Sequence, residues 1–280
     1  TLGMHRVYNS AFMNMLKNQE NQKYRQSIKN TLEFEPEILK RYVNFMNNPD
    51  EDTAIAQFGD GDRYFGIATI LATLPGLPMI GHGQIEGYKE KYGMEYSKAY
   101  FDEKPNERLI AEHYRRIFPL FRKRYLFSNV DLFNIYDCMN NGHVQEAVFA
   151  YVNGSGDERN LVLVNNQYER SSGTINKSAN KLLKKDSERS LVSISLAENL
   201  SLHFSAKSYV IFDCFTDGLS YLYPSMNIFD YGFAFTLNGY ESRVYWNIRE
   251  VEDTDGIYEK LYKIHKGEGI KDINKAITLL

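Results

Sequence analysis

The sequence has few cysteines, no long basic segment, no low-complexity segment and no internal repeat. Its two cysteines, Cys138 and Cys214, lie in different regions, so we expect two free, buried thiols rather than a disulfide framework. The formal net charge is −3, and Lys and Arg are not clustered. This argues against nucleic acid as a partner, because phosphate binding requires clustered cations. The run at residues 181–185, Lys-Leu-Leu-Lys-Lys, is too short to change this and is expected to be a solvated loop.

Charge is also missing from one long stretch. From Tyr64 to Ile85 there is no Asp, Glu, Lys or Arg, which is long enough to resemble a membrane span. Pro75 and Pro78 interrupt it, which leaves a helix of about ten residues and a short strand. We therefore expect a helix packed on a buried parallel strand and no membrane partner. The sequence begins at Thr1 without a recognisable signal peptide, so we expect a cytoplasmic protein whose true N-terminus lies upstream.

The first part of the chain, residues 1–140, alternates short apolar segments with helical patterns. Strands are expected near Tyr8, at Tyr42 and before Gly83. Apolar residues at helical spacing mark the helices: Tyr24, Ile28 and Leu32; Ile67, Ile70, Leu71 and Leu74; and Ile110, Tyr114, Ile117 and Phe121 in a helix from Asn106 to Arg124 with a kink at Pro119. Three strand–helix units in succession predict a parallel sheet with right-handed crossovers.

The pattern changes near residue 141, where apolar runs are joined by turn residues. Three hairpins are expected: one around Asn153-Gly154 between the runs at 147–152 and 161–164, one between 209–215 and 219–223, and one around Asn238-Gly239 between 232–237 and 240–248. Residues 141–250 are therefore predicted to form an antiparallel β-sandwich. Residues 251–280 predict two short helices, with Ile257, Leu261 and Ile264 as the packing stripe.

The segment at residues 42–51, Tyr-Val-Asn-Phe-Met-Asn-Asn-Pro-Asp-Glu, is the most informative part of the sequence. An aromatic and apolar strand ends there at a polar tip, because Pro49 cannot donate a hydrogen bond to a sheet. In parallel α/β sheets, ligands bind beyond the carboxyl ends of the strands. The simpler alternative is that Asn-Pro-Asp forms a turn and a helix cap.

Two motifs in this order resemble the α-amylase superfamily, glycoside hydrolase family 13. Residues 45–50 read Phe-x-Asn-x-Pro-Asp where that family ends its seventh barrel strand with Phe-x-Asn-His-Asp. Residues 73–78 read Thr-Leu-Pro-Gly-Leu-Pro and Gly83-Gln84 follows, which is similar to the Thr-Leu-Pro-Gly-x-Pro and Gly-Gln/Asp-Glu of the eighth strand. The resemblance implies an α/β plus all-β chain: a partial (β/α)8 TIM barrel of about three βα units over residues 1–140, the β-sandwich over 141–250 and a helical segment over 251–280.

The resemblance also implies an enzyme that acts on α-glucans such as starch or glycogen by a retaining mechanism. Retention needs a nucleophile and an acid/base about 5 Å apart, and the family adds a third carboxylate, which Asp50 matches. Asn48 matches the motif's Asn. Pro49 replaces a sugar-binding His, and His82 could supply the lost imidazole or be an ordinary exposed histidine. Tyr88 and Tyr92 belong to a tyrosine-rich loop expected to contact the glucan.

The nucleophile and the acid are missing. The family carries its nucleophile in an Arg-x-Asp motif, and no Arg here is followed two residues later by Asp. Glu51, Glu86 and Glu95 are not expected to replace them; Glu51 is predicted to cap a helix, and the other two to be solvated. We therefore expect the carboxyl-terminal portion of such an enzyme, inactive on its own.

Two alternatives stay open. One is a non-catalytic carbohydrate-binding or scaffold protein, and the other is a maltosyltransferase-like transglycosylase, which Pro49 favours because that branch also has Pro before this Asp. The expected partner is an α-glucan, and the open barrel edge is expected to be covered by the missing N-terminal half or by another copy of the chain. No metal or other cofactor is expected.

Overall fold

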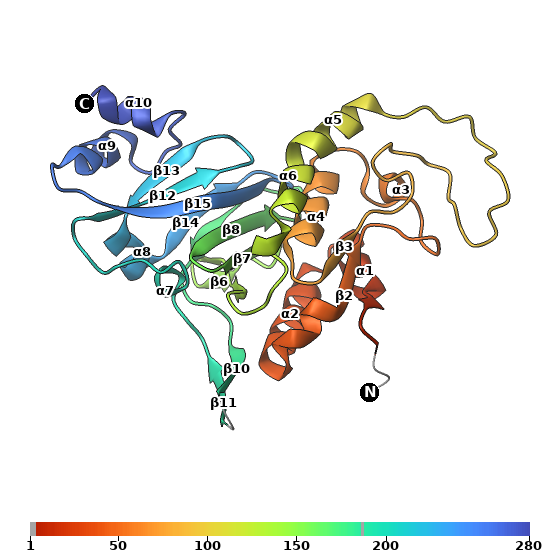
Figure 1. The fold of residues 1–280 in the computed structure, drawn as a ribbon, viewed down its shortest axis with the longest axis horizontal. Helices are drawn as coiled ribbons and strands as arrows, with labels where there is room; N and C mark the ends of the chain where they lie inside the picture. The colour runs from red at the N-terminus through yellow and green to blue at the C-terminus, as the bar shows by residue number, and fades with distance from the viewer. Residues whose placement is uncertain (1–3, 186–187) are drawn as a thin grey trace.

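The computed structural model describes residues 4–185 and 188–280. Within these ranges the strands form a three-stranded parallel sheet, a six-stranded and a four-stranded antiparallel sheet, and a separate two-stranded hairpin (Figure 1). The parallel sheet and its helices lie on one side of the molecule and the two larger sheets on the other. Among the helices described, none is long and apolar enough to cross a membrane.

The parallel sheet has the order β1-β2-β3 and consists of short strands. Its elements are β1 (Val7–Tyr8), α1 (Ser10–Lys17), α2 (Asn21–Phe34), the 3-10 helix η1 (Pro36–Arg41), β2 (Tyr42–Phe45), α3 (Ala54–Phe58), α4 (Asp62–Thr73) and β3 (Leu77–Met79). Both pairings are parallel, as predicted. The predicted stripe on α2 is confirmed, because Tyr24, Ile28 and Leu32 are all buried.

The expectation that the third strand is buried is wrong. Leu77 keeps 46% of its surface exposed, and Pro78 and Met79 are half-buried. The reason is the position of β3 at the edge of its sheet, where it pairs with β2 on one side only within the described residues.

The helix expected from Asn106 to Arg124 is interrupted near Pro119, as predicted. It divides into α5 (Glu107–Arg116), α6 (Phe118–Arg122) and the 3-10 helix η2 (Arg124–Leu126). Its predicted face is partly wrong, because Tyr114 is 61% exposed whereas Leu109, His113 and Leu120 are buried. The buried face of α5 differs from the predicted one because it includes His113. The His113 ring hydrogen-bonds to the buried Tyr64 hydroxyl, 3.1 Å away.

The six-stranded sheet lies at the centre of the molecule, with the order β13-β12-β15-β8-β7-β4. Its strands are β4 (Asn134–Tyr136), β7 (Val148–Ser155), β8 (Glu158–Asn165), β12 (Ser208–Cys214), β13 (Ser220–Pro224) and β15 (Ser242–Glu252). The first strand thus starts before residue 141, and the last extends past 250. The expected β7–β8 and β12–β13 hairpins are confirmed, although β7 continues through Asn153-Gly154, so the first turn falls later than predicted.

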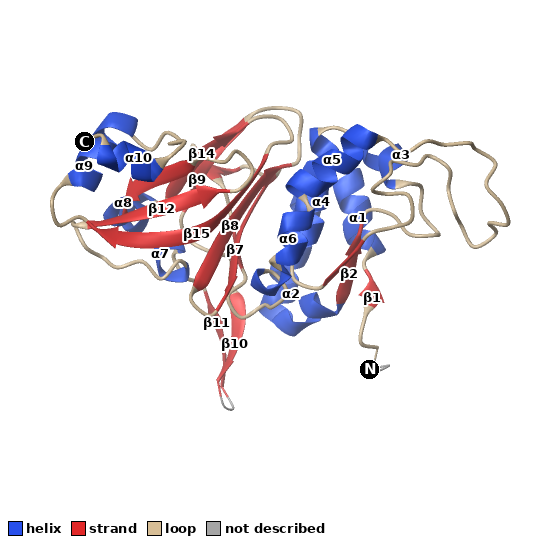
Figure 2. Ribbon diagram, turned by 45° about the horizontal axis from the view of Figure 1, so that its top comes forward, coloured by secondary structure: helices blue, strands red, loops and turns tan. Residues whose placement is uncertain are grey.

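The central strands contribute to two hydrophobic cores, one on each face. Phe149, Tyr151, Val162 and Val164 belong to the core shared with α1, α2 and α4, whereas Val148, Ala150, Val152, Leu161 and Leu163 belong to the core of the sandwich. This follows from the two-residue period of a strand, which sends alternate side chains to opposite faces. Helix α4 contacts both β2 and β8, so helices separate the parallel sheet from the central sheet (Figure 2).

The third predicted hairpin is wrong. β14 (Phe233–Leu237) pairs with β9 (Ser171–Ile175) in the four-stranded sheet of order β14-β9-β5-β6, whereas β15 pairs with β12 and β8 in the six-stranded sheet. Asn238-Gly239 therefore connects two sheets that pack face to face. A hairpin within one sheet and a connection between two facing sheets both place alternate apolar residues in one core. The sequence pattern therefore does not distinguish the two arrangements. The two remaining strands of this sheet are β5 (Met139–Asn140) and β6 (His143–Val144).

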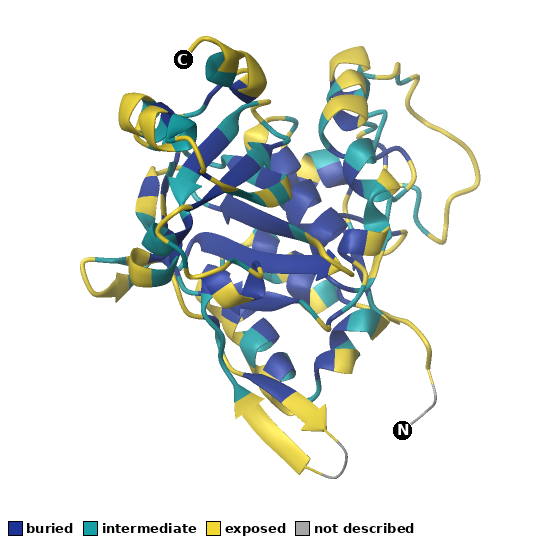
Figure 3. Ribbon diagram, turned by 60° about the vertical axis from the view of Figure 1, so that its left-hand side comes forward, coloured by how far each residue is buried: buried dark blue, intermediate teal, exposed yellow. Residues whose placement is uncertain are grey.

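Residues 181–185 form a strand rather than a solvated loop. β10 (Lys181–Lys185) pairs with β11 (Glu188–Val192) in a hairpin that projects from the body of the molecule (Figure 3). Lys181 is buried at its base, and its ammonium donates to the backbone carbonyls of Val130, Asp131 and Phe133 at 2.9, 2.6 and 3.2 Å. Three carbonyl acceptors for three N–H donors explain why a lysine is found there.

The remaining helices pack against the sandwich, the first two on its core and the last two in a third, smaller core formed with β12 and β13. They are α7 (Leu196–Asn199), α8 (Ser225–Tyr231), α9 (Ile257–His265) and α10 (Ile273–Thr278). The two C-terminal helices were predicted, but Ile264 is 61% exposed and only Leu261 of the predicted stripe is buried. Cys138 and Cys214 are free and buried, as expected.

Candidate functional site

The tip of β2 is a tight polar turn. After Phe45 the chain stays buried through Asn48 and then reaches the surface at Pro49 and Asp50. The Asn48 side-chain oxygen accepts hydrogen bonds from the backbone N–H groups of Asp50 and Glu51, at 2.9 and 3.1 Å. Asn48 therefore holds the turn that presents Asp50, as expected of an Asn side chain in such a turn.

The Asp50 carboxylate is exposed and, among the residues described, takes part in no hydrogen bond or ion pair. The helix that follows is capped by Thr53, whose hydroxyl accepts from the backbone N–H of Ala56 at 3.4 Å. The expectation that Glu51 caps this helix is therefore wrong. A carboxylate at a strand end, unpaired and facing solvent, is available to a ligand.

The tip of β3 is fixed to the tip of β2. The Gln84 side-chain oxygen accepts from the backbone N–H of Gly81 at 3.0 Å, and its amide lies 3.4 Å from the Met46 sulfur. The buried Tyr64 hydroxyl donates to the Gln84 carbonyl at 2.9 Å. Burial raises the pKa of this hydroxyl far above its usual value, so Tyr64 stays a neutral donor. Gln84 thus links the two strand ends, and Tyr64 holds the Gln84 backbone in place.

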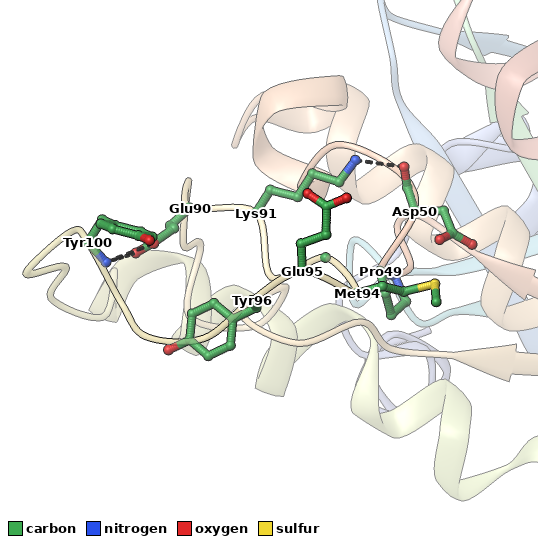
Figure 4. Close-up of a pocket in the computed structure, with 9 residues that line it drawn as sticks. Pro49, Asp50, Glu90, Lys91, Met94, Glu95, Tyr96 and Tyr100 are labelled. Carbon is green, nitrogen blue, oxygen red and sulfur yellow. Dashed lines mark hydrogen bonds between the residues drawn. The ribbon is translucent and has the colours of Figure 1, made fainter.

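A cavity of about 640 Å³ opens beside Asp50. Its walls are Pro49 and Asp50 on one side and the loop that follows β3 on the other, and Figure 4 shows the side chains. The loop residues that line it are Glu90, Lys91, Gly93, Met94, Glu95, Tyr96 and Tyr100. Lys91 reaches across and donates from its ammonium to the Asp50 carbonyl at 2.7 Å. The lining therefore combines carboxylates, an amine and aromatic rings, the groups that bind sugar hydroxyls and sugar faces.

The other predicted site residues form a neighbouring aromatic group. The exposed His82 ring lies 4.3 Å from the Tyr92 ring and 6.4 Å from the Tyr88 ring, and Tyr92 lies 4.5 Å from Tyr96. Desolvation and the Glu90 carboxylate raise the pKa of the Tyr92 hydroxyl. The structure thus brings His82, Tyr88 and Tyr92 together, whereas the cavity at Asp50 is lined by other tyrosines.

Sequence reasoning did not identify Glu90, Lys91, Tyr96 or Tyr100 as cavity residues. Their loop has no periodic pattern, and their partners lie far away along the chain. The only signal available was the unusual number of tyrosines among Lys and Glu. Within residues 4–185 and 188–280, no group of three or more His, Cys, Asp or Glu side chains is arranged to hold a metal ion.

Comparisons with known proteins identify the fold. A scan against models of protein families and a search of curated proteins find no match. Solved structures do match, and they are α-amylase-type enzymes. An α-amylase from Geobacillus thermoleovorans, complexed with acarbose, has a TM-score of 0.54 at 13% identity over 84% of this chain and 46% of its own. A maltogenic α-amylase from Thermotoga neapolitana has a TM-score of 0.55 at 16% identity over 88% of this chain and 51% of its own.

A cyclomaltodextrin glucanotransferase described as having a three-domain ABC distribution also matches, with a TM-score of 0.50 at 15% identity over 85% of this chain and 43% of its own. At these identities the likeness shows the fold. This chain has the fold of part of an α-amylase-type enzyme, and it spans about half the length of the solved structures it matches.

Proposed function

We propose that this chain is the carboxyl-terminal portion of an α-amylase-superfamily enzyme that hydrolyses or transfers glycosyl units of α-glucans by a retaining mechanism. The sequence motifs at the ends of β2 and β3 support this, as do the α-amylases and the glucanotransferase that share the fold. In this proposal the three parallel strands are the last three of an eight-stranded barrel, and the antiparallel sheets are the domain that follows it.

The observation that carries the proposal is the position of Asp50. It follows the middle strand of the parallel sheet, it lines the large cavity, and its carboxylate is unpaired among the described residues. Glycosidic cleavage passes through an oxocarbenium-like transition state with positive charge on the sugar. A fixed carboxylate beside that sugar stabilises the developing charge more than the neutral ground state, which lowers the barrier.

The nucleophile and the acid must come from outside this sequence, since no Arg-x-Asp motif is present. β1 and β3 each have one edge without a strand partner in the described chain, and exposed Val7, Tyr8 and Leu77 lie on these edge strands. We infer that further parallel strands, from the missing half of the enzyme or from another copy, cover these edges.

Replacement of Asp50 in the complete enzyme tests its role. Asp50→Asn removes the charge and retains the shape, so turnover of soluble starch should fall about a hundredfold, equivalent to about 3 kcal/mol of barrier. Asp52→Asn is the control, because Asp52 is an exposed carboxylate of the same segment that does not line the cavity. Near-normal turnover in Asp50→Asn would assign Asp50 to the turn alone.

The chain alone should hydrolyse no α-glucan. Purified chain incubated with soluble starch should release no reducing ends, because acid–base and nucleophilic steps need groups that it lacks. Steady release of sugar that disappears with Asp50→Asn would contradict the proposal that the chain is partial.

Two other functions each have one observation in their favour. The missing nucleophile favours a non-catalytic glucan-binding protein, which would bind through the aromatic group of the exposed His82 and the half-buried Tyr88 and Tyr92. The discriminating observation is the upstream sequence, which should contain no Arg-x-Asp in that case. Pro49 favours a maltosyltransferase-like enzyme, which would be recognised by a requirement for phosphate in the glycosyl donor.

A further inference from the structure

The loop between β3 and α5 is long and irregular, and it extends away from the rest of the molecule (Figure 1). Its base is closed, because the backbone N–H of Asn106 donates to the Glu86 carbonyl at 2.9 Å and the Asn106 side chain caps α5. A loop of this length with no regular structure needs specific bonds to keep one shape.

Two carboxylates cross the loop in opposite directions. The Glu103 carboxylate accepts from the backbone N–H groups of Lys89 and Glu90 at 2.7 and 2.8 Å. The Glu90 carboxylate accepts from the N–H groups of Tyr100 and Phe101, with the nearest distances at 2.8 and 2.9 Å. Ionised acceptors bind backbone N–H groups more strongly than neutral ones do. We call this pair, Glu90 and Glu103, the carboxylate clasp.

Glu90 is an unusual residue for an exposed loop. Only 7% of its surface is exposed, whereas Tyr100, which it holds, is 72% exposed. A buried carboxylate is stable only when hydrogen bonds replace its lost water, and here the backbone of the opposite limb supplies them. The loop is therefore built around Glu90, although the residues near its tip face solvent.

The clasp is joined directly to the candidate site. Lys91, next to Glu90, donates to the Asp50 carbonyl, and Gly93 lies so close that a Cβ there would be 3.2 Å from the Pro49 carbonyl oxygen. Figure 4 shows Glu90 bound to the Tyr100 backbone and Lys91 bound to Asp50. The limb that carries Tyr96 and Tyr100 is thus fixed to the limb that touches the tip of β2.

We propose that Glu90 and Glu103 are positioning residues, which hold this loop as a preformed wall of the Asp50 cavity against which glucosyl units of the glucan lie. The statement that a glucan lies against this wall rests on the proposed function, whereas the carboxylate clasp itself does not. A preformed wall avoids the cost of ordering a long loop on binding, so it raises affinity without touching the reacting bond. Loss of the clasp should therefore weaken binding of the glucan and leave the chemical step unchanged.

The experiment uses three variants of the full chain: Glu90→Gln, Glu103→Gln and the double variant. Each Gln replaces a carboxylate oxygen by an N–H₂ group that cannot accept from the backbone. Asp102→Asn is the matched control, since Asp102 is an exposed carboxylate of the same loop that does not line the cavity and accepts no hydrogen bond from the residues described. Amide hydrogen exchange, calorimetric titration with maltoheptaose and thermal unfolding are measured for the wild-type chain and all four variants.

We expect exchange at the Tyr100 and Phe101 amides to accelerate at least about tenfold in Glu90→Gln, and maltoheptaose binding to weaken by about tenfold. The double variant should be little worse than either single one, because both side chains close the same loop. Thermal unfolding should hardly change, which separates a local opening from a general loss of stability. In the complete enzyme, KM should rise while kcat is maintained.

The outcomes separate the two proposals. Unchanged exchange at Tyr100 and Phe101 in both single variants overturns the clasp, whether or not the glucan binds. Equal weakening by Asp102→Asn overturns the positioning role, because the loss of any carboxylate charge on the loop would then account for the weaker binding. Absence of maltoheptaose binding by the wild-type chain overturns the glucan-binding wall and counts against the proposed function, while accelerated exchange in the variants would still support the clasp.

Discussion

The parallel sheet and the central antiparallel sheet differ in how far their strands are supported. β1, β2 and β3 are two to four residues long, and both residues of β1 are exposed. The central strands β7 and β8 are eight residues long and are buried on both faces. The candidate site lies on the less supported sheet, which packs on its helices and, through them, on the central sheet.

This difference indicates where the parallel sheet obtains its stability. Its helices pack on residues of β7, β8 and β15, and the Thr73 hydroxyl at the end of α4 lies 2.6 Å from the Tyr151 hydroxyl. The sandwich also has a second core, to which these helices do not contribute. We therefore expect the helical region to depend on the central sheet more than the sandwich depends on the helices. The predictions below test this dependence, from the largest expected effect to the smallest.

Phe149→Ala should give the largest effect. Phe149 is 1% exposed on the face of β7 that meets the helices, and its ring lies 5.4 Å from Tyr24. Loss of such a side chain costs about 3–5 kcal/mol of unfolding free energy. Urea unfolding followed by circular dichroism and by tyrosine fluorescence measures it. If the helical region depends on the central sheet, this region should unfold first in Phe149→Ala. Val148→Ala, on the opposite face of β7, should instead shift the unfolding transition of the sandwich.

Arg25→Met should destabilise the contact between α2 and the sandwich by about 1–3 kcal/mol. The guanidinium is 1% exposed and binds Asp137 and Glu146, which keep 32% and 41% of their side chains in contact with water. The partly exposed carboxylates can be rehydrated, which limits the loss. Lys29→Met is the control: it removes a second, more exposed partner of Asp137 and should cost less than about 1 kcal/mol. Equal losses in the two variants would contradict a special role of the buried arginine.

Lys181 should give a pH-dependent effect. Burial lowers the pKa of its ammonium from 10.5 to about 8. Because the folded pKa lies below the unfolded one, the unfolded chain binds more protons between these values, and this group makes the protein more stable as pH rises. Wild-type stability should increase by about 1.5 kcal/mol relative to Lys181→Met between pH 8 and pH 9.5.

The Lys181 measurement should stop below about pH 10, where tyrosines of the unfolded chain begin to ionise. Buried tyrosines such as Tyr24, whose pKa burial raises, then make stability fall with pH. Denaturant midpoints of the two proteins at several pH values provide the comparison. Parallel pH profiles would show that Lys181 keeps an ordinary pKa.

Arg108→Ala should give the smallest effect. Its ion pair with Asp60 is 2.7 Å long, but the two side chains are 65% and 48% exposed. Such pairs contribute about 0–1 kcal/mol, and salt screens them. We expect the unfolding free energy to fall by less than about 0.5 kcal/mol, and this loss to vanish in high salt. A larger loss would mean that surface ion pairs, rather than its buried residues, mainly hold α5 in place.

Local pattern allowed much of the fold to be predicted, but not the pairing between distant segments. Tyr24, Ile28 and Leu32 form one helical stripe by spacing alone, and the β7–β8 hairpin follows from its apolar runs. The third hairpin failed because strands of one sheet and strands of two facing sheets have the same alternation. Lys181 was misread because its charge suggested solvent, whereas its carbonyl partners lie about fifty positions away in the chain.

The candidate site, too, could be predicted where local pattern marks it but not where it depends on pairing between distant residues. The end of β2 could be located from Pro49, since a proline stops a sheet, and the structure finds Asp50 at a strand end beside a cavity. The opposite wall could not be predicted, because Glu90 binds amides ten and eleven residues further on in a segment without periodicity. The roles of Asp50, Asn48, His82, Tyr88 and Tyr92 in binding a glucan stay predictions.

The sharing of one core between the first helices and the central sheet has a consequence for synthesis on the ribosome. The core that contains Phe12 and Tyr24 also contains Phe149, Val164 and Val244. The amino-terminal helices leave the ribosome long before these residues exist, so the part of their apolar faces that packs on the central sheet stays uncovered until β15 has been made. A chain truncated at residue 140 should therefore expose those faces and bind chaperones, although it contains every residue of the candidate site.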